Sequence, residues 1–165
     1  MKTIVTIACL ALLLTVAGAQ AQQKKETAQT NPTSEPKFDP SRNADQDIQN
    51  AIAEAKRTHK RIILDVGGEW CGWCHALDRY FAEHAELRAY REKNYVWLKI
   101  NYSPENPNKE VLSRYPAIKG YPHLFVLDED GKLIQSQDTS PLEEGKSYNL
   151  DRMFGFLKKW APPSQ

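Results

Sequence analysis

Two cysteines with two residues between them follow an apolar run, and this feature restricts the folds that the chain can adopt. The run Ile62-Ile63-Leu64-Asp65-Val66 is almost continuously apolar, which is typical of a strand buried on both faces. The segment Trp70-Cys71-Gly72-Trp73-Cys74-His75 follows it closely. A strand that leads into Cys-x-x-Cys at the start of a helix is typical of a redox site in an α/β protein.

The third cysteine, Cys9, lies in an N-terminal segment that has the pattern of a secretory signal peptide. A positive start is followed by an apolar, uncharged run at residues 4–17 and by the small-residue cleavage pattern Ala19-Gln20-Ala21. The run is shorter than the roughly 18 to 20 residues that cross a bilayer, which favours cleavage over an uncleaved anchor. We therefore expect residues 1–21 to be removed and the protein to be exported, to the periplasm. Both remaining cysteines then belong to the motif.

The charge and composition of the rest of the chain exclude several kinds of partner. The net charge of +1 falls to about zero without Lys2, and basic and acidic residues are mixed throughout. We therefore expect no nucleic-acid binding and no polybasic membrane contact. Residues 22–40 are polar, with a lone aromatic at Phe38, and predict a flexible linker. Residues 41–161 have the size of one domain, which we expect to be a monomer.

Hydrophobic periodicity predicts alternating helices and strands in the domain. The expected elements, in chain order, are a helix from Asn43 or Asp45, a strand at residues 61–66, a helix from about Cys71 that carries Leu77, Phe81 and Leu87, a strand at residues 95–101, a short helix at residues 108–115, a hairpin of residues 123–127 and 132–135, and a last helix from Asn149 or Asp151. Residues 136–148 are expected to form a long loop before the last helix. This order predicts an α/β fold with a central mixed sheet of about four strands and helices on both faces.

The spacing of the two cysteines suits thiol–disulfide exchange. If Cys71 occupies the first turn of its helix, unpaired backbone N–H groups and the positive end of the helix dipole stabilise its thiolate. Cys74 lies one turn further along, on the same side and deeper. Cys71 would then attack a substrate disulfide, and Cys74 would resolve the mixed disulfide. In an oxidising compartment, a reducing role would need an electron donor.

The same residues are also consistent with three other roles. A structural zinc site would need His75 and one further ligand beside the two cysteines. Copper could bind through Cys71, Cys74 and His75. The pair could also be an inert structural disulfide, although so short a bridge constrains little of the unfolded chain. A non-enzymatic module that holds a peptide or a metal is therefore the alternative to an enzyme.

Two stretches of the sequence resemble the thioredoxin superfamily. Leu64-Asp65-Val66-Gly67-Gly68-Glu69-Trp70-Cys71-Gly72-Trp73-Cys74 is similar to the active-site segment of thioredoxin-fold proteins, and Ile118-Lys119-Gly120-Tyr121-Pro122 resembles the segment that leads to their cis-proline. With the order of elements, the resemblance spans about residues 44–160. The Gly-Trp dipeptide and His75 resemble an exported thioredoxin-like group related to disulfide-handling periplasmic proteins. The resemblance implies a thioredoxin-like fold and a thiol–disulfide oxidoreductase that uses its dithiol, with no metal and no organic cofactor.

The resemblance also implies roles for individual residues. Asp65 matches a carboxylate buried beneath the second cysteine, where it would accept the proton of Cys74. Lys99, in the next strand, matches a lysine that pairs with this acid in some thioredoxins. Pro122 matches the cis-proline that lies against the disulfide and helps to dock an extended substrate backbone.

Aromatic residues near the motif are the expected substrate contacts. Trp70, Trp73 and Tyr121 offer apolar surface to an unfolded protein, although Trp73 could instead cover the core. His123 and Tyr121 flank Pro122, and either could touch substrate or pack inside.

A departure from thioredoxin at Trp73, and the neighbouring His75, affect what can be said of the direction of electron flow. Trp73 replaces the usual proline between the cysteines, where the middle residues tune the redox potential in this family. His75 could stabilise a thiolate or point away along the helix. The Asp65 pattern favours a reductase or an isomerase over an oxidase. The expected partners are protein thiol or disulfide substrates and a redox partner protein that supplies or accepts electrons.

Overall fold

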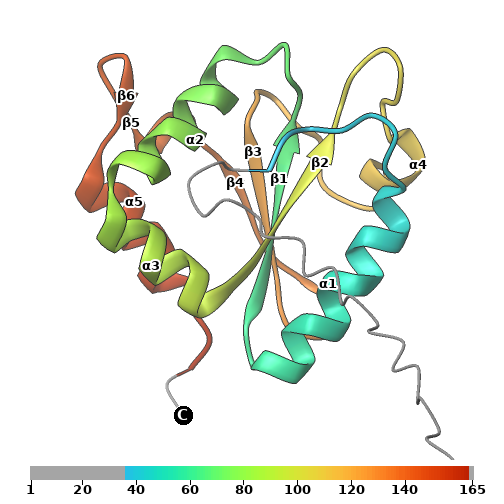
Figure 1. Cartoon of the computed structure of the whole chain (residues 1–165), viewed down its shortest axis with the longest axis horizontal. Coiled ribbons are helices and arrows are strands. Elements are labelled where there is room, and N and C mark those ends of the chain that lie inside the picture. Colours follow the sequence, from blue (N-terminus) through green and yellow to red (C-terminus); the bar gives the residue numbers. More distant parts are fainter. Residues whose placement is uncertain (1–35, 164–165) are drawn as a thin grey trace, which may run out of the picture. The chain divides into compact units, whose positions relative to one another are not determined.

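The computed structural model describes residues 36–163, and the predicted signal segment and Cys9 lie outside them. In chain order the elements are α1 (Ala44–Thr58), β1 (Arg61–Gly67), α2 (Gly72–Glu83), α3 (Ala85–Asn94), β2 (Tyr95–Asn101), α4 (Lys109–Leu112), β3 (His123–Leu127), β4 (Leu133–Asp138), a 3-10 turn (Ser140–Leu142), β5 (Glu143–Glu144), β6 (Ser147–Tyr148) and α5 (Leu150–Lys159) (Figure 1). No helix within these residues is long and apolar enough to cross a membrane.

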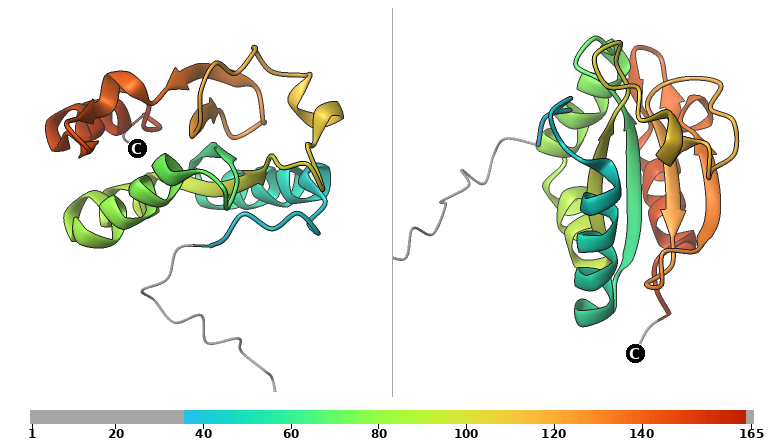
Figure 2. Two further views of the ribbon diagram at one scale, coloured as in Figure 1. Left: turned by 90° about the horizontal axis from the view of Figure 1, so that it is seen from above. Right: turned by 90° about the vertical axis from the view of Figure 1, so that its right-hand side faces the viewer.

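The central sheet contains four strands in the order β2-β1-β3-β4. β1 runs parallel to β2 and antiparallel to β3, and β4 pairs antiparallel with β3 at the other edge. Helices lie on both sides of this sheet, as the two turned views show (Figure 2). The mixed four-stranded sheet confirms the predicted α/β fold.

The alternation of side chains along β1 divides the core into two clusters. Ile62, Leu64 and Val66 pack in one cluster with residues of α1 and α4. Ile63 packs in the other cluster with residues of α2, α3 and α5. Because helices cover both faces of β1, nearly all of its positions are buried, which explains the continuous apolar run in the sequence.

Two helices begin at one of the residues that the sequence predicts. The side chain of Asn43 accepts a hydrogen bond from the N–H of Gln46 at the start of α1, and that of Asn149 accepts one from the N–H of Arg152 at the start of α5. An asparagine in this position typically stabilises a helix by about 1 kcal/mol relative to alanine. The structure therefore selects the asparagine over the nearby aspartate in both cases.

The helix expected from Cys71 through Leu87 is divided into two helices. His84 has non-helical backbone angles (φ −108°, ψ 84°) and separates α2 from α3. Leu87 nevertheless packs in the same apolar cluster as Leu77 and Phe81. Periodicity alone missed the break because both helices bury their apolar residues against the same face of the sheet.

The long loop expected at residues 136–148 is wrong in part. β4 continues to Asp138, and β5 and β6 form a small antiparallel hairpin before α5. β4 is an edge strand whose residues are all half-buried, so its sequence lacks the apolar alternation that predicts a strand. The short helix α4 is also shorter than expected and covers Lys109–Leu112.

Candidate active site

Cys71 and Cys74 form a disulfide at the start of α2. Cys71 is the N-cap residue of this helix, and its Sγ accepts a hydrogen bond from the N–H of Cys74 at 3.1 Å. Both cysteines are buried. The sulfur of Cys71 therefore lies at the positive end of the helix, as the sequence predicts, where backbone N–H groups favour a thiolate after reduction.

The end of β1 approaches the disulfide so closely that it must be glycine. A Cβ atom on Gly67 would clash with Sγ of Cys74 and would touch the ring of Phe38 at 3.0 Å. Phe38 is itself buried, with 2% of its surface exposed, and it clusters with both cysteines. The end of the predicted linker is therefore packed on the domain, and the domain begins before residue 41.

Asp65 lies in the same strand and carries its carboxylate into the protein. The side chain is 1% exposed, and its Oδ2 accepts hydrogen bonds from Lys99 Nζ at 3.0 Å and Trp97 Nε1 at 3.2 Å. The parallel register of β1 and β2 places Asp65 directly beside Lys99. Its second oxygen, Oδ1, has no hydrogen-bond partner among the described residues. The structure thus brings together the acid and the lysine that the sequence pairs.

A second carboxylate shares the same lysine, and the sequence reasoning missed it. Asp78 Oδ1 accepts a hydrogen bond from Lys99 Nζ at 2.7 Å. Burial alone would lower the pKa of Lys99, but the attraction of Asp65 and Asp78 outweighs it and raises that pKa above its ordinary value. The spacing offered a signal, because Asp78 lies four residues after Cys74 on the same side of the helix. We call Asp65, Lys99 and Asp78 the ion network.

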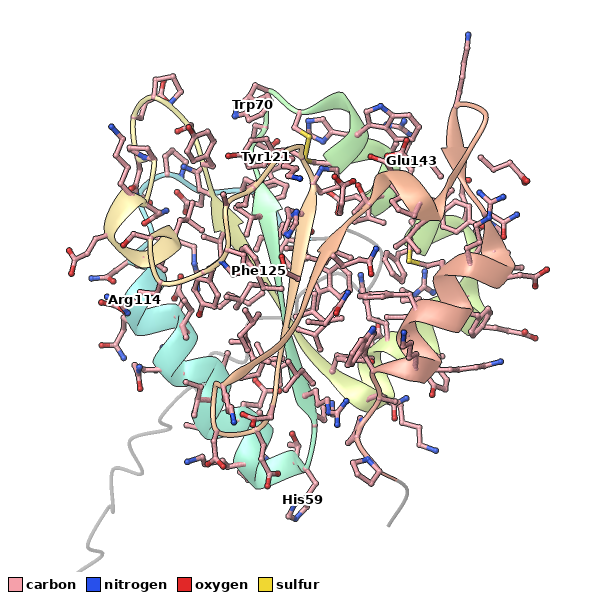
Figure 3. All side chains as sticks on the ribbon, turned by 180° about the vertical axis from the view of Figure 1, so that it is seen from behind. His59, Trp70, Arg114, Tyr121, Phe125 and Glu143 are labelled. Atoms are coloured by element: carbon pink, nitrogen blue, oxygen red, sulfur yellow. A yellow bond between two sulfur atoms is a disulfide. The ribbon has the colours of Figure 1, made fainter. Side chains whose placement is uncertain are left out.

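The other side of the disulfide is aromatic and open. The Tyr121–Pro122 peptide bond is cis and directly precedes β3. Trp70, the residue before Cys71, is 55% exposed, and its indole N–H donates to the carbonyl of Tyr102 at 2.7 Å. The Trp70 ring meets Tyr121 edge-on at 5.4 Å, and Tyr121 stacks on Tyr102 at 5.0 Å. Trp70 and Tyr121 lie together at one end of the molecule, with His59 at the opposite end (Figure 3).

Trp70 and Tyr102 line a groove that the sequence did not predict in full. The groove has a volume of about 590 Å³ and is lined by Trp70, Tyr102, Ser103, Pro104, Pro107 and Lys109. We call it the aromatic groove. Tyr102 is the functional candidate that was missed, although its place immediately after β2 puts it at the same edge of the sheet as the end of β1.

Trp73 lies between the two cysteines and is half-buried. Its ring packs edge-on against Tyr148 at 5.7 Å, and the Tyr148 hydroxyl donates to the Trp73 carbonyl at 3.3 Å. It contacts both the main core and the cluster around the disulfide. Trp73 therefore covers the core with part of its ring, and only the remainder is accessible.

The two histidines near the site lie in different environments. His75 Nε2 lies 2.8 Å from the backbone carbonyl of Glu69, so its ring is turned towards the loop before the motif. His123 is buried against Phe125, and its Nε2 lies 2.8 Å from the Ser136 hydroxyl. Burial lowers the pKa of His123 below its ordinary value. His123 thus packs inside, whereas Tyr121 contacts Trp70 and Tyr102, two residues that line the groove.

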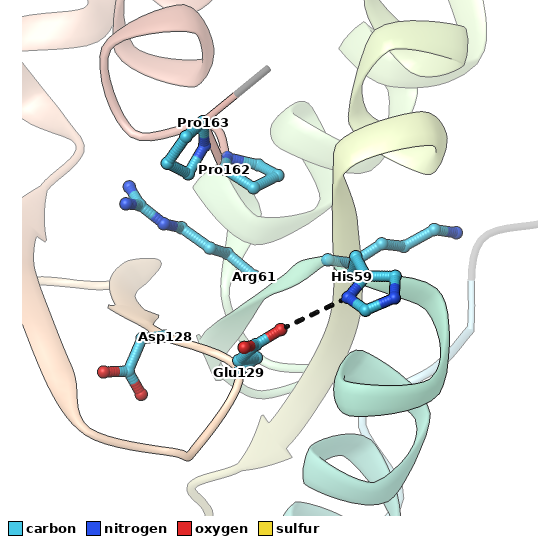
Figure 4. Close-up of a pocket in the computed structure, with 7 residues that line it drawn as sticks. His59, Arg61, Asp128, Glu129, Pro162 and Pro163 are labelled. Carbon is cyan, nitrogen blue, oxygen red and sulfur yellow. Dashed lines mark ion pairs between the residues drawn. The ribbon is translucent and has the colours of Figure 1, made fainter. Parts of the chain in front are cut away.

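A second pocket lies far from the disulfide. It has a volume of about 340 Å³ and includes His59, Arg61, Asp128 and Glu129, of which His59 and Glu129 form an ion pair at 3.8 Å (Figure 4). Acidic and basic groups are mixed here.

Residues 36–163 also contain no group of three or more His, Cys, Asp or Glu side chains that could hold a metal ion.

A disulfide at the start of the helix that follows a central strand of a mixed sheet defines a redox site of the thioredoxin type. A sequence profile described as thioredoxin-like matches residues 43–129. The chain belongs to the thioredoxin-like family.

Comparison with known proteins supports the same class. The protein disulfide-isomerase of Ricinus communis is 30% identical over 106 residues, which cover 64% of this chain and 20% of that protein. The thiol:disulfide interchange protein DsbD of Pseudoalteromonas atlantica is 23% identical over 116 residues, which cover 70% of this chain and 19% of that protein. The chain therefore spans about a fifth of the length of these relatives.

Solved structures confirm the thioredoxin-like fold. The crystal structure of a disulphide isomerase from Xylella fastidiosa Temecula1 superposes with a TM-score of 0.64 at 27% identity, covering 74% of this chain and 94% of that one. The oxidised C-terminal domain of DsbD from Neisseria meningitidis gives a TM-score of 0.55 at 19% identity, covering 76% of this chain and 99% of that one. The second likeness concerns the fold alone.

Proposed function

We propose that this protein is an exported thiol–disulfide oxidoreductase, a reductase or isomerase that exchanges disulfides with protein substrates through Cys71 and Cys74. The observation that carries the proposal is the cysteine pair at the N-terminus of α2, directly after the exposed Trp70. The relatives named for disulfide isomerisation and interchange support the same reaction.

In the reducing direction, the cycle begins with the dithiol form. The Cys71 thiolate attacks one sulfur of a substrate disulfide, so a Cys71–substrate bond forms while the second substrate sulfur leaves as a thiolate. Cys74 then loses its proton to Asp65 and attacks Cys71 Sγ. The intramolecular disulfide forms, and the first substrate sulfur leaves as a thiolate. The substrate has gained two electrons, which the cysteine pair has lost.

The substrate would bind over the disulfide on the side of Trp70 and Tyr121. Pro122 would dock the extended backbone of the segment that contains the reacting cysteine, and Trp70 and Tyr121 would contact its apolar side chains. Burial raises the pKa of Tyr121 to about 12, so its hydroxyl stays neutral even in moderately alkaline solution. The Trp70 ring is held by a hydrogen bond and an edge contact, and it therefore loses little freedom when a substrate binds. The exposed part of Trp73 would border the substrate on the other side.

Export and electron supply are further parts of the proposal. Residues 1–21 would serve as a cleaved signal segment that directs the chain to the periplasm, and the polar residues after them would form a linker. An oxidising compartment would return the pair to the disulfide, so a redox partner protein would supply electrons for a reductase. The domain would act as a monomer.

Reduction of insulin disulfides with dithiothreitol as donor tests the activity. We expect the wild-type domain to accelerate the reaction and Cys71→Ser to abolish the acceleration, because the nucleophile is lost. Cys74→Ser should instead accumulate a mixed disulfide with substrate that mass spectrometry detects. A purified wild-type protein that holds stoichiometric zinc or copper and shows no turnover would contradict the proposal and support a metal-binding module.

A further inference from the structure

Phe38 lies where the disulfide and the ion network meet. The segment that precedes α1 passes across the ends of β1 and β2 near the start of α2 (Figure 1). The Phe38 ring clusters with Cys71 and Cys74, and Lys99 Nζ lies 4.0 Å from the ring centre. One side chain from outside the predicted domain thus contacts both the redox centre and the charge buried behind it.

The surroundings of the Lys99 ammonium show what the ring replaces. An ammonium group has three N–H donors, and two of them are directed to Asp65 and Asp78. The face of the Phe38 ring occupies the third side, where a lysine nearer the surface would bind water. The Lys99 side chain is consequently only 2% exposed.

The segment that carries Phe38 is attached to the loop before the cysteines. The backbone N–H of Phe38 donates to Oε1 of Glu69 at 2.8 Å, and Glu69 lies two residues before Cys71. Glu69 is exposed, but its carboxylate binds the backbone of Phe38, whose ring is buried. This contact connects the position of Phe38 to the active-site loop.

We propose that Phe38, held by Glu69, is a positioning residue that keeps water out of the space between the disulfide and the ion network, and thereby sets the acidity of the cysteine thiols. The proposal rests on the thiol chemistry assigned above to Cys71 and Cys74. It goes beyond that assignment because it gives a redox role to a segment N-terminal to the predicted domain.

Several charged or titratable groups lie around the Phe38 ring, the ion network and the loop before the cysteines. They are Asp65 from β1, Lys99 from β2, Asp78 and His75 from α2, the buried Arg91 from α3, Glu69 from the loop and Tyr148 from β6. A thiolate formed at Cys71 or Cys74 would be buried beside the Phe38 ring, and an apolar environment without water disfavours the charged form of a thiol.

Removal of the Phe38 ring should therefore lower the pKa of the Cys71 thiol. Water that enters the space would solvate the thiolate and favour it over the neutral thiol. We expect Phe38→Ala to shift the pH profile of Cys71 alkylation down by about 0.5 unit or more, which corresponds to about threefold more thiolate below the pKa. Phe38→Leu fills most of the same volume with apolar atoms and should retain the wild-type profile.

A pair of substitutions at Glu69 provides the matched control. Glu69→Ala and Glu69→Gln remove the same charge, but only glutamine keeps an oxygen that accepts the Phe38 N–H. Any shift that both variants share is due to the lost charge. We expect Glu69→Ala to shift the profile further down than Glu69→Gln, because only alanine releases the segment.

The test measures the rate of iodoacetamide alkylation of the reduced protein against pH, with mass spectrometry to identify the modified cysteine and circular dichroism to confirm folding. A lower pKa in Phe38→Ala that Phe38→Leu restores supports the proposal. Coincident profiles for wild type and Phe38→Ala, or for the two Glu69 variants if Phe38→Ala does not fold, overturn it. The alkylation profile does not depend on turnover. A protein without insulin activity would therefore refute the proposed function, while the alkylation profiles would still test the role of Phe38.

Discussion

The two sides of the Cys71–Cys74 disulfide differ in almost every physical property. The aromatic groove in front is open, has Lys109 as the charged residue of its lining, and contains the rings of Trp70 and Tyr102, which both pack against Tyr121. The ion network behind is buried and charged, and Phe38 covers it. The difference suggests a division of labour in which the front binds substrate and the back controls the charge of the thiols.

The same contrast explains why the two sides should tolerate substitution differently. An exposed aromatic ring contributes little to folding, because water already surrounds part of it in the folded state. A buried ion pair behaves differently, because removal of one partner leaves the other charge without compensation in the interior. Substitutions in the ion network should therefore affect stability, and substitutions in the aromatic groove should affect substrate binding.

The largest expected effect is a loss of protein stability when the ion network is disrupted. Lys99→Met would leave Asp65 and Asp78 without their shared ammonium, and we expect it to lower the free energy of unfolding by about 3–5 kcal/mol. Urea unfolding of the oxidised protein measures this change. The exposed Lys56, which pairs with Asp130 on the surface, provides the control, and Lys56→Met should unfold close to wild type. Equal destabilisation by the two substitutions would contradict the contrast.

A smaller effect, on substrate binding alone, is expected for a substitution in the aromatic groove. Trp70→Ala should raise KM for a disulfide-containing peptide about tenfold, equivalent to about 1.4 kcal/mol, because a rigid aromatic contact is lost. It should leave turnover of hydroxyethyl disulfide nearly unchanged, because so small a substrate does not reach the groove. Leu150→Ala, at the other exposed large apolar residue of the described chain, is the control and should change neither KM. An equal loss with both substrates would place Trp70 in the chemistry and not in recognition.

The smallest expected effect concerns His123, which follows the cis-proline of the front but is buried. Because burial lowers the pKa of His123 in the folded protein, the folded chain takes up this proton at a lower pH than the unfolded chain, which takes it up near pH 6.5. Its contribution to stability is therefore complete above that pH and is lost as the pH falls towards the lower folded value. We expect urea midpoints at pH 7.5 and pH 5.5 to differ less in His123→Gln than in wild type. The same difference in both proteins would show that protonation of His123 is not coupled to unfolding.

The sequence predicted the fold more fully than it predicted the residues around the disulfide. The continuous run of β1 and the periodicity of the helices were sufficient for the α/β architecture, because each pattern reports local burial. The motif and its resemblance placed Cys71, Cys74, Asp65 and Pro122, and the structure brings Lys99 to Asp65 as the parallel register requires.

The residues that were missed depend on contacts between distant parts of the chain. Phe38 stands alone in a polar stretch, and only its return to the end of β1 shows that it is buried. Tyr102 belongs to the front because it stacks on Tyr121, which is distant in the sequence. Asp78 could have been found from its spacing to Cys74. Local patterns do not contain the other two contacts, because tertiary packing creates them.

Redox equilibration with glutathione tests the central claim, which is that the disulfide between the two regions is a reversible redox centre. The protein would be equilibrated at defined ratios of reduced to oxidised glutathione, alkylated and analysed by mass spectrometry. We predict one reversible two-electron transition between about −270 mV and −120 mV, the range spanned by thioredoxin and the oxidase DsbA. A pair that stays oxidised down to about −300 mV would behave as a structural disulfide and would contradict the account.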